Sequence, residues 1–279
     1  MTLVDAVALQ RELAGPNPPV LLDVRWSLTG PAGAGEYARG HLPGAVFVDL
    51  DTGLSRPRGP GEGRHPLPHP DALQEVLRAA GVSTGSPVVL YDAADSTSAA
   101  RGWWVLRWAG LRDVRVLDGG LAAWVARGGA VSTDVPAPGA GDVVVRAGAL
   151  PVLDADAVAA LARDGLVLDV RAPARYRGET EPVDPVAGHV PGAVNHPTTG
   201  HLTPSGTFLP PARLRAGFEE LGVGQGRGTV GVYCGSGVTA AHTLLALEVA
   251  GFSGVLYPGS WSEWVTDPAR PVATGPGPG

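Results

Sequence analysis

A seven-residue segment of this chain returns almost unchanged in its second half. The first copy, Gly40–Val46, reads GHLPGAV, and the second copy, Gly188–Val194, reads GHVPGAV. Each copy follows an Asp-Val-Arg triplet, which lies at Asp23–Arg25 in one half and at Asp169–Arg171 in the other. Two motifs repeated in the same order indicate two homologous domains, so one pattern of secondary structure has to fit both halves.

Short apolar runs alternate with helix-like segments in each half. The expected strands are 20–22, 46–48, 88–91, 114–117, 166–168, 230–233 and 254–257. The expected helices are 71–80, 98–109, 120–127, 154–163, 211–221 and 238–250. This alternation predicts two α/β domains, each a mostly parallel sheet with helices on both faces.

The two expected domains meet in a stretch rich in Pro and Gly, Ser132–Gly148. We therefore expect one domain over residues 1–138 and the other over residues 139–279. The first half is also longer between its GHLPGAV segment and the strand at 88–91, and the excess lies around Ser55–Pro68. That extra loop could reach across the domain interface.

The composition excludes several classes of function. With 21 basic and 27 acidic residues the formal charge is −6, and no basic run occurs, so nucleic-acid binding is not expected. Lys is absent, which excludes Schiff-base and pyridoxal phosphate chemistry. The single Cys excludes an intramolecular disulfide and any multi-cysteine metal site.

Neither a membrane span nor an export signal is expected. No apolar stretch approaches about 18 residues, the length that a membrane-spanning helix needs. Met1–Gly15 lacks the basic region and long apolar core of a signal peptide. One cysteine is compatible with a reducing compartment, so a cytoplasmic location is expected.

The single cysteine lies where the two halves differ in chemistry. Asp92 follows the expected strand of the first half, whereas Cys234 follows the matching strand of the second. The sequence from Cys234 on, CGSGVT, predicts a tight loop leading into a helix, at the strand end where α/β sheets bind ligands. Loop amides and a helix amino terminus stabilise an anionic sulfur, which favours a nucleophile over a buried structural thiol.

Together these motifs resemble the tandem-domain rhodanese-type sulfurtransferases over nearly the whole chain. The resemblance rests on the two paired motifs, on a cysteine in the second half alone, and on the segment GSWSEW at Gly259–Trp264. It implies two rhodanese-like domains, of which the first, with Asp92 at the cysteine position, is non-catalytic. It also implies an enzyme whose cysteine takes sulfur from a donor as a persulfide and passes it to an acceptor in ping-pong order.

The loop sequence bears on the sulfur donor. CGSGVT resembles the loop of mercaptopyruvate sulfurtransferases, whereas thiosulfate-preferring relatives carry Arg and Lys after the cysteine. A dianion profits from two loop cations, while a monoanionic keto acid needs one carboxylate clamp. Gly235 and Ser236 therefore favour 3-mercaptopyruvate, with thiosulfate as the alternative donor.

The resemblance also implies a substrate-binding role for Arg175, which matches an arginine of the family. Mercaptopyruvate enzymes often have a second arginine a little further along, but the aligned region here reads Glu181–Asp184. Arg64 or Arg177 could take its place as a second cation for the substrate.

Further contacts to the substrate are expected from the first half and from the cysteine loop. His65 resembles a first-domain histidine that lines the family's active site. Ser236 is expected to hydrogen-bond the substrate carbonyl or to relay a proton. In a Ser-His-Asp relay the carboxylate position would fall near Leu54–Ser55, where no acidic residue lies, and this argues against a complete relay. Thr239 is expected to cap the helix or to hydrogen-bond the sulfur. The loop residues expected to bind substrate are Gly235, Gly237, Val238 and Thr239.

Residues that recur in the half without a cysteine are expected to be structural. This applies to the Asp-Val-Arg pairs and to His41 and His189. The tryptophans at helical or turn positions are expected in the core. They are Trp103, Trp104, Trp108, Trp124, Trp261 and Trp264.

The expected reaction requires neither a metal nor an organic cofactor. A small molecule is the expected sulfur donor, and a thiol, a thioredoxin-like protein or cyanide is the expected acceptor. A cysteine phosphatase or arsenate reductase of the same fold would need an arginine at the end of the loop, and the sequence through Ala241 has none. An alternative of a different class is a sulfur-carrier module that turns over no small donor.

Overall fold

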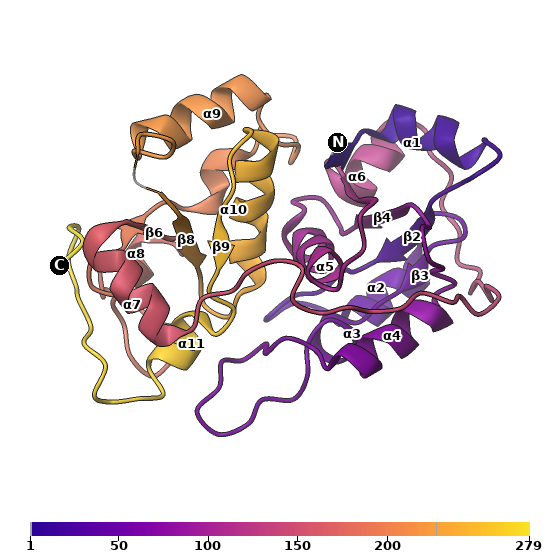
Figure 1. Cartoon of the computed structure of the whole chain (residues 1–279). Coiled ribbons are helices and arrows are strands. Elements are labelled where there is room, and N and C mark those ends of the chain that lie inside the picture. Colours follow the sequence, from indigo (N-terminus) through magenta and orange to yellow (C-terminus); the bar gives the residue numbers. More distant parts are fainter. Residues whose placement is uncertain (1, 227) are drawn as a thin grey trace. The chain divides into compact units, whose positions relative to one another are not determined.

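The computed structural model describes residues 2–226 and 228–279 and divides the chain into two compact units. Unit 1 comprises Met1–Arg56, Leu67–Leu150 and Leu202–Phe208. Unit 2 comprises Pro57–Pro66, Pro151–His201 and Leu209–Gly279. Each unit contains one copy of the repeated motifs. Figure 1 shows the helices and strands of the chain.

Unit 1 contains a five-stranded sheet in the order β1-β5-β4-β2-β3, with all pairs parallel. Its strands are β1 (Leu3–Val4), β2 (Val20–Asp23), β3 (Val46–Phe47), β4 (Val88–Tyr91) and β5 (Val114–Leu117). Its helices are α1 (Ala6–Leu13), α2 (Gly33–Arg39), α3 (Leu50–Gly53), α4 (Pro70–Ala79), α5 (Thr97–Trp108) and α6 (Gly120–Ala126).

Unit 2 contains a four-stranded sheet in the order β7-β6-β8-β9, again with all pairs parallel. Its strands are β6 (Leu166–Asp169), β7 (Val194–Asn195), β8 (Val230–Tyr233) and β9 (Val255–Leu256). Its helices are α7 (Ala155–Asp164), α8 (Pro173–Tyr176), α9 (Pro211–Glu220), α10 (Val238–Val249) and α11 (Ser260–Trp264), with a 3₁₀ helix η1 (Thr198–His201). The predicted α/β class and parallel sheets are confirmed.

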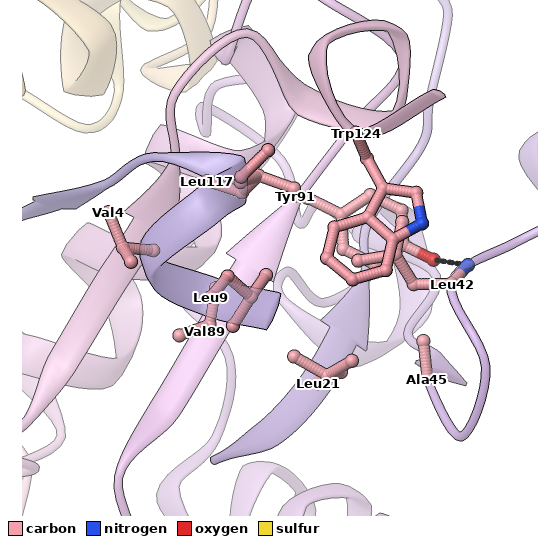
Figure 2. Close-up of a cluster of buried hydrophobic side chains, with 10 residues drawn as sticks. Val4, Leu9, Leu21, Leu42, Ala45, Val89, Tyr91, Leu117 and Trp124 are labelled. Atoms are coloured by element: carbon pink, nitrogen blue, oxygen red, sulfur yellow. Dashed lines mark hydrogen bonds between the residues drawn. The ribbon is translucent and has the colours of Figure 1, made fainter. Parts of the chain in front are cut away.

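Helices cover both faces of the sheet in unit 1. Alternate side chains of a strand point to opposite faces, and Val89 of β4 packs on one face with Leu9 of α1 and Trp124 of α6 (Figure 2). On the other face α5 approaches so closely that a Cβ added at Gly102 would lie 2.4 Å from Leu90 Cδ2. The core is therefore two apolar layers, one on each side of the strands.

Unit 2 repeats this arrangement (Figure 1). Val167 of β6 and Tyr233 of β8 pack in a buried cluster with Val158 of α7 and with Trp261 and Trp264 of α11. Helix α10 contacts β8 and β9 and carries buried residues along most of its length. Of the tryptophans expected in the core, Trp108 alone is half-buried and the others are buried.

The repeated residues form the same structural network in both units. In unit 1, Arg25 Nη2 donates to Asp23 Oδ2 at 2.7 Å and to the Gly40 carbonyl at 2.8 Å. In unit 2, Arg171 Nη2 donates to Asp169 Oδ2 and to the Gly188 carbonyl, both at 2.6 Å. Each carboxylate is fully buried, so each ion pair ties a strand end to the loop that carries the repeated Gly-His segment.

The repeated histidines complete this network. His41 Nδ1 is 2.9 Å from the Tyr37 carbonyl, and His189 Nδ1 is 2.8 Å from the Tyr176 carbonyl. Each imidazole also stacks on the ring of the same tyrosine. The repeated residues thus make the same internal contacts in both units, as their expected structural role requires.

The composition-based domain boundary differs from the division into units. Residues 139–150 lie in unit 1, where their backbone bonds to the carboxyl ends of α4 and α5. The Gly141 amide donates to the Arg78 carbonyl at 2.8 Å, and the Arg146 amide donates to the Ala109 carbonyl at 2.8 Å. The extra segment Pro57–Pro66 lies in unit 2.

A cluster of aromatic rings surrounds a buried histidine in unit 2. His201 is 2 % exposed, and neither of its ring nitrogens has a hydrogen-bond partner among the described residues. Its ring lies 5.3 Å from that of Phe218, 5.0 Å from that of His196 and 5.7 Å from that of His242. Burial, together with repulsion by His242 and His196, lowers the pKa of His201 to about 2.

This histidine is expected to make the fold sensitive to acid. The unfolded chain protonates His201 near pH 6.5, whereas the folded chain does not until about pH 2, so stability is lost as the pH falls below about 6.5. Between pH 7.5 and pH 5 the loss is about 2 kcal/mol. Urea unfolding at the two pH values should show that His201→Phe reduces this loss, while replacing the exposed His69 by Gln does not. Equal losses in wild type and His201→Phe would contradict the assignment.

Candidate active site

Cys234 lies at the carboxyl end of β8, in a four-residue turn that leads into α10. The side chain is 2 % exposed, and Sγ accepts a hydrogen bond from the Gly237 amide at 3.2 Å. Gly237 has a φ of +80° and forms the N-cap of α10, so the turn uses the conformational freedom of glycine. The sulfur therefore lies at a helix amino terminus, where the amides and the helix dipole favour negative charge.

The start of α11, the helix that follows β9, holds the backbone of the cysteine. Ser260 Oγ accepts from the Cys234 amide at 3.2 Å and donates to the Tyr257 carbonyl at 2.9 Å. The Trp261 amide donates to the Cys234 carbonyl at 3.0 Å. Ser260 adopts a left-handed φ of +54°, which is uncommon for a residue other than glycine. Because β8 and β9 are parallel neighbours, their loops leave the sheet at the same edge and can brace each other.

The segment Pro57–Pro66 brings two predicted residues to this edge. His65 Nδ1 is 2.7 Å from Ser236 Oγ, and both side chains are 6 % exposed. The Arg64 amide donates to Ser262 Oγ at 3.0 Å. A Cβ added at Gly63 would lie 2.4 Å from the Gly259 carbonyl oxygen, so only glycine permits this close approach.

Two arginines lie next to the residue that follows the cysteine. A Cβ added at Gly235 would be 2.8 Å from Arg64 Nη2 and 3.6 Å from Arg175 Nη2. Both side chains are 18 % exposed. Arg177, the other arginine expected as a second cation, pairs instead with the exposed Glu179. The structure thus brings together Arg64 and Arg175, whereas both side-chain bonds of Arg177 go to Glu179.

Two buried carboxylates pair with these arginines, and sequence reasoning missed their role. Glu181 Oε1 accepts from Arg175 Nη2 at 2.6 Å and also from the amides of Val183 and Asp184. Asp184 accepts from Arg175 Nη2 at 3.3 Å and forms an ion pair with Arg64. The only signal in the sequence was the departure from the family pattern at Glu181–Asp184.

The remaining predicted residues line the start of α10. Val238 is buried as the first residue of the helix, and Thr239 follows it half-buried. Gly237 occupies the N-cap and no side chain caps this helix, so Thr239 does not cap it, and the alternative that Thr239 hydrogen-bonds the sulfur stays a prediction. The physical reason is that the helix begins at Val238, which places Thr239 in the first turn.

Residues 2–226 and 228–279 hold no group of three or more His, Cys, Asp or Glu side chains arranged for a metal ion. Within the same ranges, no helix has both the length and the apolar character needed to cross a membrane.

Known proteins resemble this chain over nearly its whole length. A profile of the Rhodanese-like domain matches residues 5–127 and 154–267. A Mycobacterium tuberculosis protein named as a thiosulfate sulfurtransferase, SseB, is 47% identical over 276 residues, which cover 98% of this chain and 97% of that protein. A Pseudomonas aeruginosa protein named as a 3-mercaptopyruvate sulfurtransferase is 48% identical over 279 residues and 98% of each chain.

A solved structure shows the same fold over almost the whole chain. SseA from Escherichia coli, described as a 3-mercaptopyruvate sulfotransferase, superposes with a TM-score of 0.82 and 31% sequence identity. The match covers 94% of this chain and 100% of SseA.

Proposed function

This chain belongs to the rhodanese family and is a sulfurtransferase, and we propose that Cys234 is its nucleophile and 3-mercaptopyruvate its sulfur donor. One observation carries the proposal. Cys234 Sγ lies at the amino terminus of α10 and accepts the Gly237 amide, while the guanidinium groups of Arg64 and Arg175 lie beside Gly235. A nucleophile and an anion-binding group therefore flank the same short turn.

In the proposed first half-reaction the Cys234 thiolate attacks the sulfur of 3-mercaptopyruvate. An S–S bond forms, the C–S bond breaks, and its electron pair remains on the carbon of the leaving group. Protonation of that carbon yields pyruvate and leaves Cys234 as the persulfide. Amides of the turn and of the first turn of α10, from Gly235 to Thr239, stabilise the sulfur anion.

The neighbouring side chains supply binding and proton transfer in this proposal. Arg175 and Arg64 bind the donor carboxylate, since a guanidinium matches a carboxylate with two hydrogen bonds. The Ser236 hydroxyl contacts the donor carbonyl, and its hydrogen bond to His65 provides a route for the proton that reaches pyruvate.

In the second half-reaction an acceptor thiolate, a thioredoxin-like protein or cyanide attacks the outer sulfur. The S–S bond breaks and returns its electron pair to Cys234, so the enzyme is regenerated without a net redox change. We place this exchange in the cytoplasm, where thiol acceptors are kept reduced.

Thiosulfate is the second candidate donor. Two guanidinium groups next to the turn can bind an oxyanion, and the relative from Mycobacterium tuberculosis is named for thiosulfate. Sulfite would then leave in place of pyruvate.

Intact mass spectrometry of sulfur-free protein tests the proposal. We expect brief incubation with 3-mercaptopyruvate to add one sulfur, and to do so faster than thiosulfate. A thiol should remove the added sulfur, and Cys234→Ser should gain none. Faster loading by thiosulfate would reverse the donor assignment. No gain with either donor would contradict the enzyme mechanism and favour a sulfur carrier that is loaded by another protein.

A further inference from the structure

Asp184 lies between the two arginines that flank the cysteine turn. Its side chain is 5 % exposed, one carboxylate oxygen pairs with Arg64, and the other is 3.3 Å from Arg175 Nη2. An internal carboxylate thus occupies the position between two guanidinium groups that an anionic donor would use.

Glu181 and Asp184 are held differently, although both contact Arg175. Glu181 accepts from Arg175 through both oxygens and from two backbone amides, and its Oε2 is 3.4 Å from Arg171 Nη1. Burial raises the pKa of Glu181, but its bonds to Arg175 and to the Asp184 amide outweigh burial and leave the pKa below its ordinary value. These contacts make Glu181 a fixed part of the site.

Among the described residues, the Asp184 carboxylate pairs only with the two arginines, Arg64 and Arg175. Burial and the neighbouring Glu181 keep its pKa above the ordinary value, although Arg64 and Arg175 oppose them. Of the two carboxylates, Asp184 is therefore the one that an incoming anion can replace at the guanidinium groups.

The charges of this cluster cancel. Arg64 and Arg175 carry two positive charges, and Glu181 and Asp184 carry two negative charges. Arg171 is already paired with Asp169 at 2.6 Å and adds no net charge. Such a neutral, largely buried cluster compensates the lost hydration of a donor with one negative charge better than that of a donor with two.

We propose that Asp184 is a specificity-determining residue that disfavours dianionic sulfur donors, such as thiosulfate, relative to monoanionic 2-oxo acids. This inference rests on the proposed function. Asp184 acts by cancelling one of the two guanidinium charges, so its removal should benefit each donor in proportion to the donor's charge. The ratio of kcat/KM for thiosulfate to kcat/KM for 3-mercaptopyruvate then rises on the order of tenfold, as expected for one added unit charge close to a protein surface.

Steady-state kinetics with both donors test this inference in wild type, Asp184→Asn and Glu179→Gln. Asparagine keeps the size of the side chain and removes the charge. Glu179 lies on the same segment but pairs with Arg177, so Glu179→Gln removes a charge without touching Arg64 or Arg175. We expect the donor ratio to rise at least threefold in Asp184→Asn and to stay unchanged in Glu179→Gln. A purely structural role for Asp184 would change both donors by the same factor.

Several results would overturn the inference. They are an unchanged donor ratio in Asp184→Asn, or an equal rise in Glu179→Gln. A wild-type protein that takes sulfur from neither donor overturns the proposed function and this inference together, whereas wild-type turnover with an unaltered ratio in Asp184→Asn overturns the inference alone. Should Asp184→Asn fail to fold, inhibition of wild type by unreactive anions replaces it: pyruvate should compete at about tenfold lower concentration than sulfate, and equal competition contradicts the inference.

Discussion

Arg175→Ala is expected to lower kcat/KM for 3-mercaptopyruvate by about two orders of magnitude. Truncating one member of a largely buried, hydrogen-bonded charge pair weakens binding by about 2–5 kcal/mol, and each 1.4 kcal/mol is about tenfold. The loss should appear mainly in KM, because the proposed role of Arg175 is to bind the donor carboxylate, which does not react. Steady-state kinetics with intact-mass analysis of the persulfide measure both effects.

The matched control is Arg177→Ala. Arg177 lies two residues further along, and its guanidinium pairs with Glu179 at the surface, so its removal should leave kcat/KM within about twofold. The kcat/KM of Arg175→Lys should lie between those of Arg175→Ala and Arg177→Ala. An ammonium group keeps the charge but lacks the planar guanidinium that binds Glu181 and, in the proposal, the donor carboxylate. Equal losses in Arg175→Ala and Arg177→Ala would remove Arg175 from the substrate-binding role.

The fold could be predicted because the same motifs and the same alternation of strands and helices occur in both halves of the chain. Strands β4 and β8 lie where the sequence predicts them, at 88–91 and 230–233. Two of the elements that escaped prediction are short or poorly formed by propensity. Strand β7 spans two residues and shows no period, and α2 begins in a Gly-Ala-Gly segment that disfavours a helix. Both are held by tertiary contacts rather than by local preference.

The site could be predicted only where it is local in sequence. The turn from Cys234 to Gly237 follows directly from a strand, a glycine-rich segment and a helix. The contact between Arg64 and Asp184 joins residues 120 positions apart, and nothing in either segment indicates the other. The sequence shows that the family's second arginine is absent near Asp184. That an ion pair between Arg64 and Asp184 lies there instead is seen only in the structure.

Asp92→Ala is expected to lower the free energy of unfolding by about 4 kcal/mol. In the first half Asp92 occupies the position after the strand that Cys234 occupies in the second half. Asp92 follows β4 and is 4 % exposed. Its carboxylate accepts four backbone amides at 3.0–3.2 Å, those of Ala94, Ser96, Ser98 and Ala99. Alanine would leave these buried donors without an acceptor, and each unsatisfied group is worth about 1–3 kcal/mol before local relaxation.

Asp95→Ala is the control for this prediction, because the exposed Asp95 accepts one amide, that of Thr97, at the start of α5. Loss of such a bond should lower stability by about 1 kcal/mol. Urea unfolding should therefore give a much lower free energy of unfolding for Asp92→Ala than for Asp95→Ala. Asp92→Asn should lie between them, because the asparagine side chain keeps one acceptor oxygen. Similar losses for Asp92→Ala and Asp95→Ala would show that the carboxylate does not organise this turn.

Sulfur loading separates this structural effect from catalysis. Asp92 lies in unit 1, whereas the side chains proposed to bind the donor lie in unit 2. Folded Asp92→Ala protein should thus still form the persulfide on Cys234, even though its stability is reduced. The two turns then perform the same local task with different groups. The carboxylate of Asp92 accepts several amides of its turn, whereas the sulfur of Cys234 accepts the Gly237 amide and in the proposed reaction also attacks the donor.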